Sequence, residues 1–279
     1  MPSTFTILAK RVFFDFNTRL RIRHMAGWPL DAWDAVRGKR DPLIPPRGLW
    51  FIGGGARHRQ IAEDVLRYLV KDGLTPQDCV LDMGCGIGFL AARLTRFIAG
   101  GSYDGFDVVP LATDWASSHI SKLHPNFRFQ HADVFSKHYN PRGKLKPEEF
   151  TFPYRPATFD FVFGISLFTH LLPAPAEWYL REMARTLKPR GQGWLSTFLI
   201  NEESAALVRA GKSSLALAPQ SDCWVLDPGF PETAVGLMEP DFRRWCASAG
   251  LEIKRIDRGH WCGRTDYVGG QDHVIMQKV

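Results

Sequence analysis

The chain has 279 residues, 45% of them hydrophobic, which is enough for one large α/β domain with its own core. No stretch approaches the roughly 18 consecutive apolar residues of a membrane-spanning helix, and the first residues lack the apolar run and cleavage site of a secretory signal. These two absences predict a cytoplasmic protein.

The net charge of +6 is concentrated near the N-terminus. Residues 1–60 contain eleven Lys or Arg against four acidic residues, a local charge of +7, whereas the rest of the chain carries 24 basic against 25 acidic residues. Apolar side chains recur at three- and four-residue steps in residues 4–25, which predicts an amphipathic basic helix. Such a helix can contact an anionic membrane surface or an acidic partner. The alternative is that it folds back over the domain as a lid.

The five cysteines are scattered, odd in number and include no C-x-x-C pair. This pattern argues against a disulfide framework and against a structural zinc site, so no metal is predicted.

Helices and strands alternate along the chain after a stretch rich in Pro and Gly at residues 27–55, which we interpret as an ordered linker. Helical periodicity marks residues 57–71, 89–98, 111–123, 176–187 and 240–249. Short apolar runs predict strands at residues 79–83, 103–108, 127–132, 159–166, 193–199, 251–257 and 273–278. This alternation predicts an α/β fold with a doubly wound, mostly parallel sheet.

The run at residues 80–90 is an apolar strand that breaks into three alternating glycines before a helix: Gly84, Gly86 and Gly88. Glycine has no Cβ, so such a loop can turn sharply and bring its amides against a ligand at the start of the helix. Asp107 comes nineteen residues after the last of these glycines, at the end of the next strand, where a carboxylate can accept from two ribose hydroxyls. A dinucleotide fingerprint would need a further glycine at the position of Phe89.

The loop, preceded by Asp82, instead resembles motif I of the class I S-adenosylmethionine-dependent methyltransferases. Further resemblances follow in order at residues 131–134, 159–162 and 187–193, the last with Arg190 where the family usually has glycine. The resemblance covers about residues 57–279 and implies a seven-stranded sheet whose strand seven lies antiparallel beside strand five. We therefore expect a basic helical and linker extension at residues 1–55 and a methyltransferase domain at residues 56–279, with insertions at about 137–157 and 201–239.

The resemblance implies S-adenosyl-L-methionine as cofactor. In this family the residue matching Asp82 faces the methionine end, the one matching Asp107 holds the ribose, and the one matching Asp133 accepts from the adenine amine. The expected cofactor site comprises Asp82, Gly84, Cys85, Gly86, Gly88, Asp107, Val108, Asp133, Val134 and Ile165.

His170 follows the fourth predicted strand, at the edge of the sheet where open α/β folds bind ligands, and is the leading candidate for a general base. The alternative is that it bonds backbone or shapes the cofactor pocket. The candidates for substrate contact are Tyr139, Tyr154 and Asn201, with His138 and Glu202 as neighbours. Further candidates to face or cover the cofactor are His58, Trp261 and Cys262.

The predicted function is transfer of a methyl group to a hydroxyl of a small-molecule or glycan-like acceptor by in-line displacement. Two alternatives stay open: a methyltransferase that reaches RNA or a membrane lipid through the basic segment, and a non-catalytic cofactor-binding scaffold. Nucleic acid is the less favoured acceptor, because the chain has no N-P-P-Y-type tetrapeptide after strand four and no appended RNA-binding module. Thiol or arsenic methylation would require several cysteines to converge, and the sequence leaves the oligomeric state open.

Overall fold

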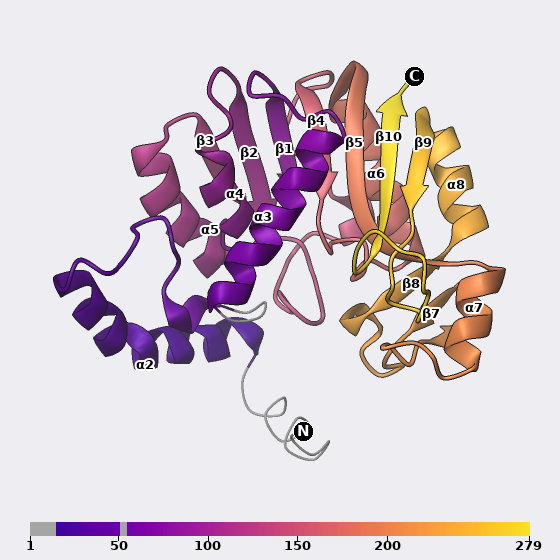
Figure 1. Ribbon diagram of the computed structural model, residues 1–279, viewed down its shortest axis with the longest axis horizontal. Helices are drawn as coiled ribbons and strands as arrows, with labels where there is room; N and C mark the ends of the chain where they lie inside the picture. The colour runs from indigo at the N-terminus through magenta and orange to yellow at the C-terminus, as the bar shows by residue number, and fades with distance from the viewer. Residues whose placement is uncertain (1–14, 51–54) are drawn as a thin grey trace.

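The computed structural model describes residues 15–50 and 55–279, with residues 55–58 described by their backbone alone. Its centre is a sheet in which β3, β2, β1, β4 and β5 pair in parallel in that order, and β10 lies antiparallel between β5 and β9 (Figure 1). These strands are β1 Cys79–Met83, β2 Ser102–Asp107, β3 Phe127–His131, β4 Phe159–Gly164, β5 Leu187–Ile200, β9 Leu251–Asp257 and β10 Asp272–Lys278. The predicted parallel sheet and its antiparallel strand seven beside strand five are confirmed.

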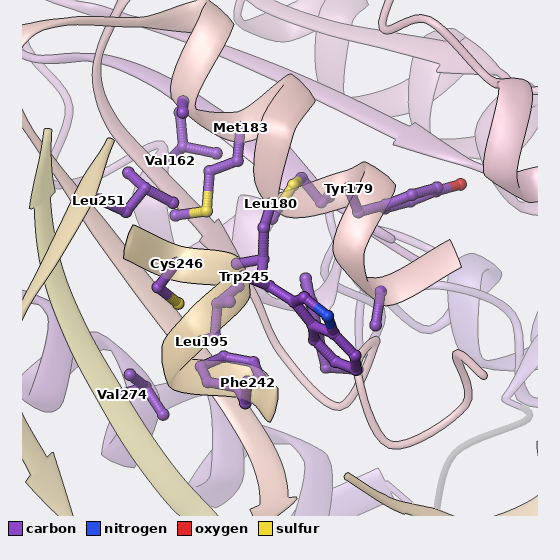
Figure 2. Close-up of a cluster of buried hydrophobic side chains, with 14 of the residues drawn as sticks. Val162, Tyr179, Leu180, Met183, Leu195, Phe242, Trp245, Cys246, Leu251 and Val274 are labelled. Carbon is purple, nitrogen blue, oxygen red and sulfur yellow. The ribbon is translucent and has the colours of Figure 1, made fainter. Parts of the chain in front are cut away.

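Helices cover both faces of this sheet. One face carries α3 Gly55–Lys71, α4 Phe89–Leu94 and α5 Pro110–Ala116, which a π-helical segment, η2 Ser117–Ser121, extends. The other carries α6 Pro173–Thr186 and α8 Glu239–Ser248, whose apolar side chains meet those of the strands in the core shown in Figure 2. The two cores explain the strand sequences, because side chains alternate between the faces of a strand that is buried on both sides.

Both predicted insertions lie at the end of the sheet where the parallel strands finish. The first, after β3, contains a short helix, η3 Pro147–Glu149. The second is more ordered than a loop: it holds α7 Glu202–Arg209, β6 Ala218–Gln220, β7 Cys223–Val225, η4 Pro231–Thr233 and β8 Val235–Met238. Strand β8 pairs with the last residues of β5, and β7 pairs with β8, so this segment extends the sheet. Strands of three or four residues show no measurable alternation, which is why the sequence pattern does not reveal them.

The helix of the N-terminal extension continues further along the chain than predicted. Residues 4–14 of the predicted basic helix lie outside the described residues, and the described helix, α2, runs from Phe16 to Val36. The prediction of a linker from residue 27 is therefore wrong for residues 27–36. Gly27 and Pro29 disfavour a helix locally, but the short helix η1 Arg47–Leu49 packs against α2, and the amide of Arg47 donates to Asp31 Oδ2 at 3.1 Å. None of the described helices has the length and apolarity to cross a bilayer.

Candidate active site

A cavity of about 830 Å³ lies at the carboxyl ends of β1, β2 and β4. Its walls also include parts of both insertions and the start of α6. This is the edge at which open α/β sheets bind ligands, and the volume is within the range of about 300–1,000 Å³ typical of small-molecule sites. Of the residues predicted for the site, those that line the cavity are Gly84, Gly86, Asp107, Val108, Val134, Tyr139, Ile165 and His170.

The glycine loop turns through left-handed backbone conformations that side chains disfavour. The φ angles are +77° at Gly84, +54° at Gly86 and +80° at Gly88. The first two glycines line the cavity, whereas a Cβ on Gly88 would come within 2.8 Å of the Ile120 side chain. Gly88 therefore allows α4 to pack closely, and Cys85 between these glycines is buried outside the cavity wall.

Asp107 connects the end of β2 to this loop. Its Oδ2 accepts from the amide of Gly86 at 2.7 Å, and its Oδ1 accepts from the amide of Val109 at 2.9 Å. Burial raises the pKa of Asp107, while these amide hydrogen bonds act in the opposite direction. An ionised carboxylate has about four acceptor sites, so Asp107 keeps free acceptor capacity toward the cavity that it lines.

Asp82 lies beneath the loop rather than in the cavity wall. Its side chain is buried, and the hydroxyl of Tyr103 donates to Oδ2 at 2.7 Å. Burial raises the pKa of Asp82 to about 7, with a smaller contribution from the charge of Asp107, and the Tyr103 hydrogen bond opposes this rise. A buried acid, Asp82, and a partly buried one, Asp107, thus lie next to the glycine loop, a setting that favours a ligand carrying positive charge and hydrogen-bond donors.

Asp133 does not line the cavity in this structure. Its carboxylate pairs with Lys144 Nζ at 3.6 Å, and its carbonyl oxygen accepts from the amides of Lys144 and Leu145. Its neighbour Val134 does line the cavity. The carboxylate predicted to accept from the adenine amine therefore faces a lysine of the first insertion.

His170 lines the cavity and is held by the second insertion. Its Nδ1 lies 2.7 Å from the backbone carbonyl oxygen of Glu232, and its ring meets that of Tyr139 edge-on at 5.5 Å. A carbonyl oxygen only accepts, so Nδ1 carries the hydrogen and Nε2 of the neutral ring keeps its lone pair. Burial lowers the pKa of His170, and the Glu232 carbonyl opposes this shift. The ring is thus neutral at pH 7 and able to accept a proton.

Of the three residues predicted to contact substrate, only Tyr139 reaches the cavity. Burial raises its pKa to about 12, so its hydroxyl stays protonated at neutral pH. Tyr154 packs edge-on against Phe159 at 5.0 Å, and Asn201 caps α7 and donates to Glu239 at 2.9 Å. Packing on β4 and capping of α7 place these two side chains away from the cavity, so their predicted roles in lining it are wrong.

The further candidates whose side chains the structure describes also lie outside the cavity wall. His138 packs against Tyr139, and the indole of Trp261 donates to Asp272 at 2.8 Å in a buried cluster that lies next to Cys262. Glu202 is exposed at the start of α7. The side chain of His58 lies outside the described part of the chain.

Several residues of the cavity wall are not apparent from the sequence pattern. Ser166 has a φ angle of +56°, a strained conformation for serine that is typical of functional turns. Tyr179 comes from α6, and Glu232 comes from η4, 62 residues beyond His170. Only a tertiary contact brings Glu232 here, so no local signal could identify it. Among the described residues, no group of three His, Cys, Asp or Glu side chains is arranged to hold a metal ion.

Comparison with known proteins agrees with this geometry. Residues 80–191, from β1 to β5, match a family model described as a methyltransferase domain. Many solved structures share the fold, and three illustrate the range. A Pyrococcus horikoshii protein has 17% identity and a TM-score of 0.56, over 80% of this chain and 92% of the other. Magnesium protoporphyrin IX methyltransferase from Synechocystis, with bound S-adenosylhomocysteine, has 20% identity and a TM-score of 0.51, over 80% and 84%.

The third structure, the cyclase SpnF, has 17% identity and a TM-score of 0.52, over 93% of this chain and 96% of its own. Identities this low establish a shared fold and not a shared substrate. The family match covers the glycine loop, Asp107 and His170, which are the features that build the cavity. Residues 80–191 thus match a methyltransferase domain, and the solved structures share the fold of the surrounding chain.

Proposed function

We propose that the protein transfers a methyl group from S-adenosylmethionine to a hydroxyl of a small-molecule or glycan-like acceptor. Bound at this site, the cofactor would supply a methyl group on a sulfonium centre. The cavity residues fit it: Asp107 retains acceptor capacity for ribose hydroxyls, and the backbone at Gly84 and Gly86 is accessible to a ligand. The acids Asp82 and Asp107 suit a cofactor that carries positive charge.

The observation that carries the choice of a hydroxyl acceptor is the hydrogen bond from His170 Nδ1 to the Glu232 carbonyl, 2.7 Å long. This bond orients the imidazole with Nε2 as the proton acceptor in the cavity wall. A hydroxyl must lose its proton as it is methylated, and a positioned base accelerates such a step typically about 10²–10⁴-fold. Tyr139 packs against the ring and helps to fix its orientation.

The remaining wall suits an acceptor with both polar and apolar parts. Apolar side chains of the wall, such as Leu167 and Leu171, exclude water. Charged side chains of the wall can bond hydroxyl groups: Lys144, Lys146, Glu148 and Asp222. Holding acceptor and donor in line is worth up to about 7–11 kcal/mol of the barrier, so positioning by this wall supplies most of the catalysis in our proposal.

The test uses the purified full chain, labelled S-adenosylmethionine and the small-molecule fraction of a cell extract, followed by mass analysis of labelled products. We expect a product that carries one added methyl group as a methyl ether. Labelled products methylated only on nitrogen or sulfur would contradict the hydroxyl acceptor but not the cofactor. Absence of turnover with every acceptor, despite tight cofactor binding, would favour the non-catalytic scaffold.

A further inference from the structure

Helix α2 has one face that packs against the protein. Leu20 and Asp31 are buried on this face, and a Cβ added to Gly27 would come within 3.3 Å of the Gly48 backbone nitrogen in η1. Asp31 Oδ1 also pairs with Arg40 at 2.8 Å. These contacts fix the rotation of the helix about its axis, and therefore determine which side chains face outward.

The opposite face is an apolar stripe in contact with solvent. Its residues follow one another at steps of three or four, so they share one side of the helix: Ile22, Met25, Pro29, Trp33 and Val36. All five are exposed, with exposed fractions of 55% for Trp33 and 85% for Val36, and two more large exposed apolar side chains, Trp28 and Leu30, flank the stripe. Exposed apolar clusters of this kind mark contact surfaces.

The exposed charged residues around the stripe are basic. The exposed residues beside it and at its C-terminal end include Arg21, Arg23, Arg37 and Lys39. The two acidic residues of α2 are paired on the packed side: Asp31 with Arg40, and Asp34 with Arg47 at 2.6 Å. The outward surface of α2 thus combines apolar and cationic side chains. A partner that complements it has an apolar interior beneath an anionic surface.

Helix α2 is also tied to the rim of the cavity. Asn17 Nδ2 donates to the carbonyl oxygen of Tyr139 at 3.0 Å, and the Phe16 ring packs edge-on against the Tyr139 ring at 5.2 Å. Figure 1 shows α2 (indigo) running outward along the end of the domain where the parallel strands finish. No residue of α2 lines the described cavity, so α2 does not cover it as a lid.

We propose that the α2 stripe docks the protein on an anionic lipid bilayer, with α2 lying in the plane of the interface. A helix with aromatic and aliphatic side chains on one side and basic residues at the borders is the typical interfacial design. Tryptophan is favoured at this depth because its ring is apolar while its N–H reaches water. This inference does not depend on the identity of the methyl acceptor.

The test is sedimentation of the full chain with phosphatidylcholine vesicles that contain phosphatidylserine, compared with phosphatidylcholine vesicles alone. We expect binding to the anionic vesicles at low salt, weak binding to the neutral ones, and loss of binding at high salt. The variant Met25→Ser/Trp33→Ser should lose most of this binding. A matched control, Leu123→Ser/Tyr267→Ser, removes two exposed apolar side chains elsewhere and should bind like the wild type.

A second variant keeps the test valid if the first one misfolds. Arg21→Gln/Arg37→Gln leaves the stripe intact and should weaken binding about fivefold for each arginine removed. Thermal unfolding checks that each variant is folded. No binding of the wild type to anionic vesicles would overturn the proposal. Concentration-dependent dimers that dissociate in the Met25→Ser/Trp33→Ser variant, without vesicle binding, would overturn it in favour of a second copy of the chain.

Discussion

The imidazole of His170 and the backbone of Glu232 meet at 2.7 Å, from Nδ1 to the carbonyl oxygen. The carboxylate of the same Glu232 accepts from the hydroxyl of Ser136 at 2.7 Å and from the amide of Lys137 at 3.2 Å. One residue of the second insertion therefore holds both the first insertion and the proposed base. The pairing fixes the hydrogen on Nδ1 and leaves Nε2 as the basic nitrogen.

We expect His170→Gln to lower kcat by about 10²–10⁴-fold with little change in cofactor affinity, because it removes a proton acceptor. In the wild type, activity should fall with acid as the imidazole becomes protonated. The lowered pKa of His170 places this fall below pH 6.5, the ordinary value, in the kcat/KM profile of the free enzyme. A profile of kcat/KM against pH, measured for both proteins, checks this, and an unchanged acid fall in the variant would exclude His170 as the base.

The Glu232 carboxylate holds the first insertion, part of which forms the cavity wall. In Glu232→Gln the amide keeps only one acceptor oxygen, and hydrogen bonds to a charged group are worth about 1.5–3 kcal/mol. We therefore expect this variant to raise the KM for the acceptor about tenfold. The backbone carbonyl that orients His170 remains, so the pH dependence of kcat should persist. Steady-state kinetics with the identified acceptor measure both quantities. Glu149→Gln, at an exposed residue of the first insertion, serves as the control, and equal effects of the two substitutions would refute the role of Glu232.

Much of the fold could be predicted because its signals are local. Strands β1 and β4 are short apolar runs between turns, and they are buried on both faces, as such runs predict. The missed parts depend on tertiary contacts: β8 exists because it pairs with the end of β5, and α2 continues past Gly27 because η1 packs on it. Local propensity disfavours a helix there, and the packing overrides it.

The residues predicted for the cofactor agree with the structure better than the residues predicted for the acceptor. The cofactor side follows from a glycine spacing and from Asp107 at a strand end, and the structure joins the two through the hydrogen bond from Gly86 to Asp107. The part of the cavity proposed for the acceptor is formed by the insertions, where the position of a residue in the sequence does not determine which way its side chain points. Asn201 caps a helix, whereas Glu232 reaches the cavity. Contacts between segments distant in the sequence determine where these side chains lie, and the sequence pattern gives no information about such contacts.

Stability should decrease as the pH falls from about 6.5 toward 4, in part because of His273. Its ring is buried between Tyr68, at 4.8 Å, and Trp194, at 4.6 Å, and burial lowers its pKa to about 4. The unfolded chain binds a proton near pH 6.5 while the folded protein does not, so protonation favours unfolding by up to about 3 kcal/mol in this window.

Urea unfolding of the wild type and His273→Phe at pH 7.5 and pH 5 measures this contribution. The variant keeps an aromatic ring in the site but has no titratable group there. We expect a smaller loss of unfolding free energy in the variant than in the wild type between the two pH values. An equal loss in both proteins would show that His273 does not titrate in this way.

The central claim is that the glycine loop and Asp107 form a site for S-adenosylmethionine. The most direct measurement is calorimetric titration of the full chain with S-adenosylhomocysteine, for the wild type, Asp107→Asn and the control Asp114→Asn, which changes an exposed acid of α5. We predict saturable binding by the wild type and the control. Asp107→Asn should bind at least tenfold more weakly, because each lost hydrogen bond to a charged group is worth about 1.5–3 kcal/mol. No saturable binding by the wild type, or unchanged affinity in Asp107→Asn, would contradict the account.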